Sequence, residues 1–171
     1  MRFRCLTVLA LLLALSCDQR AETETSQRAA EVTDRVRVFL IAPQDGGVVG
    51  QRIGCGDSAV PVEVTLPRAE PALHGAFHSL LGRRSRNDPA SGYYNALYAS
   101  PLELQRIERV GGEARVHLTG YLEIGDSCDG QRALAQLTET ALQFQDVQRV
   151  QLWLDGKPLR DLLFKSGKTA G

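Results

Sequence analysis

The four cysteines constrain this chain most, because two lie near its N-terminus and two lie far apart in the remainder. Cys17 ends an apolar run that two arginines open and that contains Cys5, and residues 6–15 of this run carry no charge. A basic start, an apolar centre and a small residue before the end are the parts of a secretory signal. Once such a signal is removed, Cys55 and Cys128 are the pair left to cross-link the folded part of the chain.

The letters LALSC, which end at Cys17, resemble a bacterial lipoprotein signal, in which the cysteine is acylated and becomes the mature N-terminus. This resemblance implies removal of residues 1–16, lipid attachment at Cys17, and an extracytoplasmic location on an inner or outer bacterial membrane. The run is shorter than the about 20 residues that a transmembrane helix needs. A retained signal anchor is the alternative interpretation.

Cys55 and Cys128 each precede an expected element, and each has glycine and aspartate nearby. Because disulfides persist outside the cytoplasm, we predict a disulfide that joins the start of the second strand to the start of the second helix. A pair of free thiols for redox chemistry or metal binding is the alternative, which the extracytoplasmic location disfavours.

Charge is balanced along the chain. The sequence carries 20 acidic and 20 basic side chains, and loss of Arg2 and Arg4 with the signal leaves 18 basic ones. Such a balance provides no overall attraction to nucleic acid or to anionic lipid. We therefore expect no nucleic-acid partner, and we expect membrane attachment through the lipid anchor.

Four parts are expected along the chain: a signal peptide over residues 1–16, a flexible tether over 17–34, a folded domain over 35–160 and a tail over 161–171. The tether has few apolar side chains to bury, which is typical of flexible segments.

Apolar periodicity within the domain predicts five strands and two helices. The strands are expected over residues 36–40, 60–64, 102–110, 114–119 and 149–154, and the helices over 71–82 and about 130–144. Pro61 restricts its strand to an edge or irregular position, Gly111-Gly112 is a hairpin signal, and Asp129 is the expected N-cap of the second helix. This order favours an α+β two-layer sandwich, with a largely antiparallel sheet of about five strands and both helices on one face.

Several segments, in this order, resemble a GerMN domain, the sporulation and spore-germination domain. They are VRVFLIAP, CGDSAVPV, YYNALYASPLELQRIERVGGEARVHLTG, QLTETALQF and VQRVQLWLDGKPL, and they run from Val36 to Leu159. The resemblance implies a fold similar to the ring-building domains of envelope complexes, with no enzymatic activity and no cofactor. The chain has one copy, and its cysteine pair resembles GerMN-like lipoproteins from outside the spore formers.

Two local patterns suggest catalysis or metal binding. Gly56-Asp57-Ser58 resembles the triplet of some serine hydrolases, but their partner histidine lies near the C-terminus and here no histidine follows His117, so we interpret the triplet as a turn. His74 and His78 have the i, i+4 spacing of a metal pair, although no third ligand is evident. We expect no metal and no catalytic residue, and a metal-dependent enzyme is the weakest alternative.

The outward side chains of the expected sheet are unusually basic and aromatic for a neutral chain. The candidate interaction residues are Arg37, Phe39, Arg115, Arg149 and Trp153, together with Tyr93, Tyr94 and Tyr98 of a long polar loop over residues 83–101. Trp and Arg are favoured interface anchors, whereas an RNA-binding platform does not suit the expected compartment. Alternatively, the tyrosine loop folds over this face and buries it.

These patterns together predict a non-enzymatic, membrane-anchored envelope lipoprotein that scaffolds or recognises a partner protein. A module that binds wall glycan or a small ligand, with the tyrosine loop as a lid, is the alternative. Ring assembly would follow only by analogy of fold, which is a weak basis for function.

Overall fold

Strand β1 (Asp34–Ala42) begins the part of the chain that the structure describes, which is residues 34–67 and 70–164 of a computed structural model. The expected signal peptide, Cys17, nearly all of the tether and the end of the tail lie outside these residues. Within them, no helix is long and apolar enough to cross a membrane.

The first sheet contains β1, β2 (Gln51–Arg52) and β3 (Ser58–Leu66), with β3 in the centre and all pairs antiparallel. Pro61 of β3 lies opposite Phe39, beyond the reach of the short strand β2, so its missing N–H faces no strand. The expected edge position of this strand is therefore wrong, because β3 is central, although Pro61 itself lies past the end of β2 where no strand pairs with its outer side.

The second sheet contains β4 (Leu102–Val110), β5 (Glu113–Gly120), β6 (Arg149–Leu154) and β7 (Lys157–Pro158), in that order. β4 and β5 form the expected hairpin, and both glycines of its turn have positive φ, as a tight hairpin turn requires. β6 pairs with β5 in parallel, because helix α3 carries the chain back across the sheet between them.

Helix α2 (Ala72–Leu81) agrees with the predicted helix, whereas α3 (Ser127–Leu142) begins three residues earlier than expected. The N-cap is Asp126, whose carboxylate accepts hydrogen bonds from the backbone N–H groups of Cys128 and Asp129 at 2.8 Å. Asp129, the predicted cap, is buried inside the helix and has other partners. The 3-10 turn η1 (Gly54–Gly56) precedes β3, and α4 (Leu159–Phe164) extends past the expected domain end.

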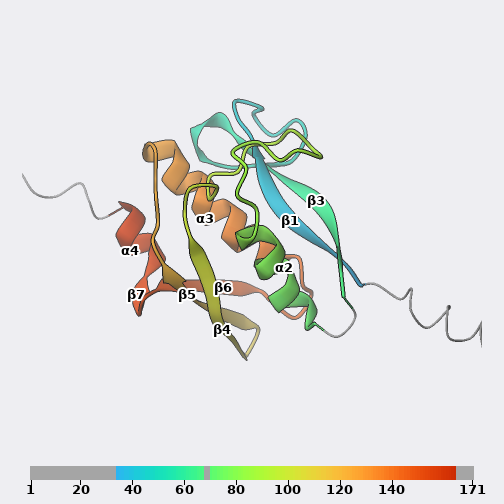
Figure 1. Cartoon of the computed structure of the whole chain (residues 1–171), viewed down its shortest axis with the longest axis vertical. Coiled ribbons are helices and arrows are strands. Elements are labelled where there is room, and N and C mark those ends of the chain that lie inside the picture. The colour runs from blue at the N-terminus through green and yellow to red at the C-terminus, as the bar shows by residue number, and fades with distance from the viewer. Residues whose placement is uncertain (1–33, 68–69, 165–171) are drawn as a thin grey trace, which may run out of the picture. The chain divides into compact units, whose positions relative to one another are not determined.

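The α+β class and its mainly antiparallel pairing are confirmed, but the strands are divided between two sheets and do not form one (Figure 1). The physical reason lies at the outer edge of β1, where side chains of α3 take the place of a further strand. Phe39 N–H donates to Thr140 Oγ1 at 3.1 Å, and the Gln136 amide donates to the Phe39 carbonyl at 3.0 Å. Gln143 bonds the backbone of Arg37 in the same way. This edge is therefore covered against further pairing.

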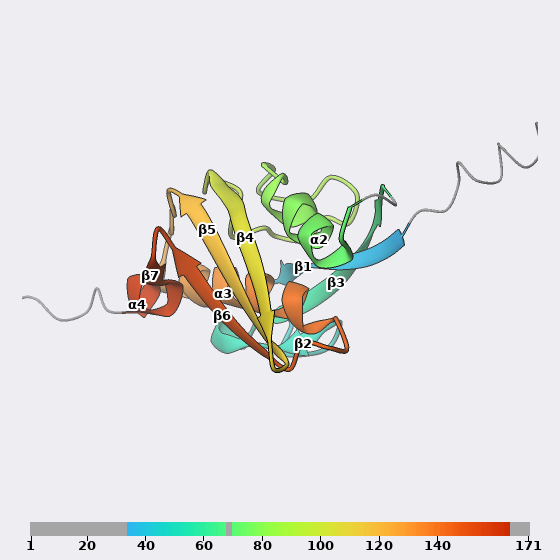
Figure 2. The ribbon, with the colours of Figure 1, turned by 90° about the horizontal axis from the view of Figure 1, so that it is seen from below.

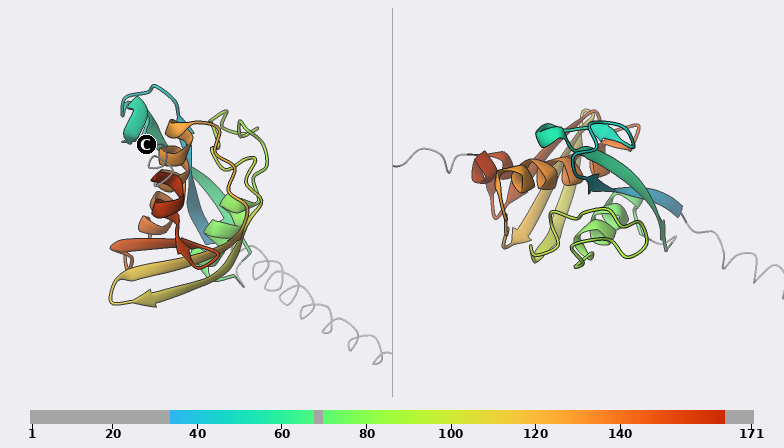
Figure 3. Two further views of the ribbon diagram at one scale, coloured as in Figure 1. Left: turned by 90° about the vertical axis from the view of Figure 1, so that its left-hand side faces the viewer. Right: turned by 90° about the horizontal axis from the view of Figure 1, so that it is seen from above.

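Helices α2 and α3 each contact both sheets, and α3 runs alongside the two sheets (Figure 3). The main core lies between these elements and includes the fully buried side chains of Leu40, Phe77, Leu118 and Leu137. Helix α3 packs against both sheets. Its side chains bond the edge of β1 on one side, whereas on the other side a hollow remains between α3 and β6.

Candidate functional site

The predicted disulfide is present and joins Cys55 of η1 to Cys128 in the first turn of α3, with the two Cα atoms 5.9 Å apart. Cys55 adopts a positive φ of 60°, and Gly56 after it has a φ of 72°. This left-handed turn brings the chain back toward the helix before β3 begins.

A buried cluster of charged groups follows the two cysteines in sequence. Arg132 donates from Nε to Asp57 at 2.6 Å and from Nη1 to Asp129 at 3.0 Å, and Asp57 has no exposed surface. The Tyr94 hydroxyl donates to the same Asp129 oxygen at 2.9 Å, and the Arg132 guanidinium lies 5.5 Å from the Tyr94 ring centre. One cation is thus held by two carboxylates and one aromatic ring.

Burial, together with the hydrogen bond to Asp129 and the charge of that carboxylate, raises the pKa of the Tyr94 hydroxyl to about 12. Burial opposes the charge of Arg132, but the hydrogen bonds and charges of Asp57 and Asp129 outweigh it and raise the pKa of the guanidinium. Both groups therefore keep their protons near neutral pH. The cluster acts as a structural clamp, and neither Tyr94 nor Arg132 is available as a base.

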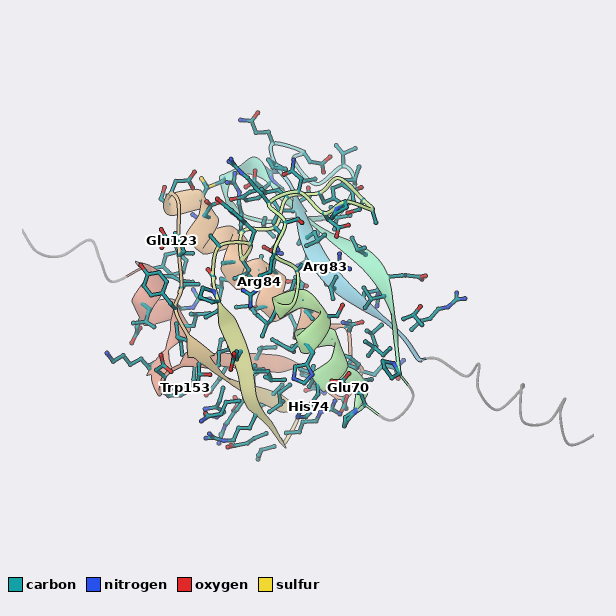
Figure 4. The ribbon with its side chains drawn as sticks, in the orientation of Figure 1. Glu70, His74, Arg83, Arg84, Glu123 and Trp153 are labelled. Carbon is teal, nitrogen blue, oxygen red and sulfur yellow. A yellow bond between two sulfur atoms is a disulfide. The ribbon has the colours of Figure 1, made fainter. Side chains whose placement is uncertain are left out.

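The tyrosine loop, residues 83–101, is held by this clamp and by β1. Tyr94 and Ile41 exchange two backbone hydrogen bonds of 2.8 Å, and Ala96 N–H donates to the buried Gln136 side chain. Arg83 pairs with the buried Asp88 inside the loop, and Arg84 donates to the carbonyl of Ser100 (Figure 4). The hydrogen bonds of the loop to other parts of the chain are with β1, α3 and the segment after β5, where Ser100 bonds the backbone of Glu123, and none of them places the loop over the outer face of the second sheet.

The triplet Gly56-Asp57-Ser58 is occupied in structural contacts. The Ser58 hydroxyl donates to Asp45 at 2.6 Å and accepts from the Gly47 N–H, while Asp57 accepts from Gln44 N–H in addition to Arg132. The structure thus places the triplet at the end of a loop, as the sequence interpretation has it.

His78 contacts the carboxylate of Glu70 at 2.5 Å, and His74 lies one turn earlier on α2. Figure 4 shows Glu70 and His74 well apart from Trp153 of β6. Within residues 34–67 and 70–164, no group of three or more His, Cys, Asp or Glu side chains is arranged to hold a metal ion.

The outer face of β4, β5 and β6 holds three of the predicted interaction residues. Trp153 stacks on His117 of the neighbouring strand, with ring centres 6.2 Å apart and planes 13° apart. Arg115 pairs with Glu113 at 2.7 Å, and Arg149 approaches the same carboxylate at 3.8 Å. This face is therefore mixed in charge, because carboxylates on β4 and β5 accompany its arginines.

The expectation of one outward face that also includes Arg37 and Phe39 is wrong. These two residues belong to the other sheet, and Phe39 is only 9% exposed. Residues 38–41 are all buried, since that end of the first sheet is covered on both faces. Tyr93, Tyr94 and Tyr98 are half-buried in the loop, and Tyr94 bonds Ile41 of β1 and Asp129 of α3.

A groove separates β6 from the exposed side of α3. Its first part has a volume of about 350 Å³, and its lining is Leu134, Thr138, Val150, Gln151, Leu152, Trp153, Pro158 and Arg160. A second hollow of about 410 Å³ shares Leu134, Thr138 and Arg160 and continues along α3 toward Gly54. Figure 2 shows β6 beside the short strand β7, with α3 behind the sheet.

The sequence profile of the Germane family, described as sporulation and spore germination, matches residues 38–160. The chain belongs to this family. The predicted GerMN resemblance is thereby confirmed, and the disulfide agrees with the expected variant. No curated protein matches this Germane chain significantly.

Solved structures show the same fold. The tandem GerMN domains of the sporulation protein GerM from Bacillus subtilis align with a TM-score of 0.54 and 16% identity, over 74% of this chain and 40% of that one. This Germane chain thus spans less than half of the tandem protein. The first GerMN domain of GerM (TM-score 0.49, 19% identity, 72% and 85% covered) and a candidate lipoprotein from Clostridium perfringens (0.43, 11%, 73% and 76%) align less closely.

Sequence reasoning missed the polar row on α3 of this Germane domain. Arg132, Gln136, Thr140 and Gln143 recur at helical spacing on one side of the helix, and each binds the loop, β1 or the segment that precedes β3. The spacing is visible in the sequence, but the partners of these side chains outside α3 are 40 or more residues away. No sequence pattern indicated the groove beside β6.

Proposed function

We propose that this Germane domain is a non-catalytic, lipid-anchored module of a bacterial envelope that binds a partner protein through the β6 side of its second sheet. The observation that carries the proposal is the stacked pair Trp153 and His117 on a sheet face that the tyrosine loop does not contact. An exposed Arg149, with 64% of its side chain accessible, extends the same surface. A partly buried Trp beside an exposed Arg is typical of interface centres.

The polar groups that most resemble catalytic ones have structural partners. Arg132, Asp57 and Tyr94 hold one another, and Ser58 bonds Asp45. These contacts give the polar groups at the centre of the fold a structural role, which favours binding over catalysis as the function of the domain.

A photo-reactive amino acid in place of Gln151 tests the proposal in envelopes of the native host. Gln151 is exposed and lies in register with Arg115 on this face. We expect discrete protein adducts, which Arg149→Glu and Trp153→Ala each abolish without a loss of thermal stability. A cross-linker at the exposed Glu63 of the other sheet is the matched control and should give none of these adducts.

Two outcomes count against the proposal. Adducts that persist in both variants would place the partner elsewhere, and co-sedimentation with purified wall in place of protein adducts would favour the glycan-binding alternative. The anchor is tested separately by the intact mass of protein purified from membranes. We expect a chain that begins at an acylated Cys17 and gains two hydrogens on reduction, whereas an unmodified mass that includes residues 1–16 would remove the envelope location.

A further inference from the structure

The edge of β6 is open where it borders the groove. Arg149 N–H donates to the Gly112 carbonyl at 3.1 Å, and Asp155 N–H donates to the Leu118 carbonyl at 3.0 Å. In a parallel pair alternate residues face the neighbouring strand, so the backbone groups of Val150 and Leu152 point away from β5. β7 pairs with Trp153 and Leu154 alone, and no other strand of the described chain lies beside Val150 and Leu152.

This opening differs from the outer edge of β1, which the polar row of α3 covers. On its β6 side, α3 presents Leu134 and Thr138, which do not bond the strand and leave a hollow of about 350 Å³. Two residues of β6 thus offer two N–H donors and two carbonyl acceptors along an apolar groove. An open edge of this kind is a template for one more strand.

The charged side chains that line the two hollows are Arg160, which lines both, and Glu139, which lines the second. Arg160 lines both hollows, is exposed, and forms no ion pair with any residue in the described ranges. Lys157 of β7 is also exposed at this end of the strand. Glu139 accepts a hydrogen bond from Gln51 and forms no ion pair with Arg160, so a carboxylate on the incoming segment can pair with this cation.

We propose that the β6 edge binds an extended segment of the partner protein as an additional strand. The segment has apolar side chains at alternate positions, which enter the groove between Leu134 and Trp153, and a carboxylate that pairs with Arg160. Val150 and Leu152 supply the backbone hydrogen bonds. This inference rests on the proposed partner-binding function and names the chemical class of the partner.

A second copy of this chain fits the edge less well. α3 forms a wall along the groove, and a symmetric pairing of two β6 edges would bring two α3 helices and two Arg160 side chains together. A single extended segment avoids both the crowding and the repulsion. The occupant to which we commit is therefore a peptide strand of another protein.

The test uses the full protein with its disulfide intact and the blocked hexapeptide Thr-Val-Thr-Val-Glu-Thr as a probe. Trp153 is the sole tryptophan, so its fluorescence reports binding at the groove. We expect the peptide to change this fluorescence and to slow amide hydrogen exchange at Val150 and Leu152. An analogue with both valine amides methylated should bind about tenfold or more weakly, because it lacks two donors.

Three variants localise the effect. Thr138→Arg fills the groove from α3 and should abolish binding, whereas Gln145→Arg, beyond the helix, is the matched control and should have no effect. Arg160→Glu should reverse the preference from a glutamate-containing to a lysine-containing peptide. Unchanged exchange at Val150 and Leu152 at millimolar peptide, or equal binding of the methylated analogue, would overturn the inference.

The same variants separate this inference from the proposed function. If Thr138→Arg leaves the envelope adducts intact while Arg149→Glu removes them, partner binding stands and the strand-addition mode fails. If the protein sediments as a dimer that Thr138→Arg dissociates, the edge pairs with a second copy, and the peptide proposal is overturned.

Discussion

Asp57 is the residue whose role differs most from what its sequence context indicates. It belongs to a triplet that resembles a catalytic motif, yet its carboxylate is fully buried and holds Arg132. The sequence reveals the triplet but not the arginine, because the two residues are 75 positions apart. The local sequence around Asp57 therefore predicts a turn, whereas its buried ion pair with Arg132 is visible only in the tertiary structure.

Replacing this carboxylate should be costly. Asp57→Ala removes one of two anions from a partly buried cation, and we expect the free energy of unfolding to fall by about 3–5 kcal/mol. Urea unfolding measures this change. Asp146→Ala, which breaks the exposed pair with Arg109, is the control and should cost under about 1 kcal/mol. Equal effects of the two changes would contradict the structural role of the cluster.

Asp88 gives the molecule an acid-sensitive contact. Burial opposes its charge, but hydrogen bonds from Ser91 and the charge of Arg83 outweigh burial and hold the pKa of the carboxyl below 3.8. The folded pKa is thus lower than the unfolded one, so the stabilisation is present above about pH 3.8 and is lost as the pH falls through the folded value. Unfolding measured from pH 5 downward should show a smaller acid loss in Asp88→Asn than in the unchanged protein. An identical loss in both would contradict this assignment.

Helix α3 is the element that the sequence described least completely. Its apolar stripe and approximate bounds followed from periodicity, and Leu137 and Ala141 are buried as expected. The hairpin of β4 and β5 followed from Gly111-Gly112. The division into two sheets could not be predicted from the sequence. It depends on α3 side chains that bond the backbone of β1, about 100 residues away along the chain.

Gln136 is the side chain of α3 on which this arrangement depends most. It accepts from Ala96 N–H and donates to the Phe39 carbonyl and to Asn95, with no exposed surface. Gln136→Leu keeps the volume but leaves buried backbone groups unpaired, at about 1–3 kcal/mol each. We expect faster hydrogen exchange at Ala96 together with lower stability. Gln143→Leu, nearer the surface, is the milder comparison, and equal exchange in the two variants would contradict the role of Gln136.

At the scale of the whole molecule, family, fold class and disulfide were accessible from the sequence, since each depends on composition, order and cysteine number. The outward interaction face was only partly accessible. Trp153, Arg115 and Arg149 do share a face, but Phe39 was assigned to it by simple alternation, which fails where a sheet is buried on both faces.

Removal of the disulfide tests the whole fold. Replacing Cys55 and Cys128 by serine opens a loop with a sequence separation of 73 and should lower the free energy of unfolding by about 4 kcal/mol in the chain-entropy model. The measurement is urea unfolding of the double variant beside the oxidised protein. The reduced protein should agree with the variant, and a stability unchanged by reduction would contradict the prediction.

The same disulfide limits how far the molecule can lengthen under mechanical load. If the chain is anchored before β1 and a partner holds β6, force enters at Asp34 and leaves near Arg149. The shortest covalent route between these points runs along the first strand to Cys55 and crosses directly to Cys128. Residues 56–127 lie outside that covalent route, so the chain between the two cysteines is not extended even if β1 is pulled free. The segment released before the cross-link is about 20 residues, or about 70 Å when fully extended, so the tyrosine loop and the hairpin would stay attached to α3 while the tether gains reach.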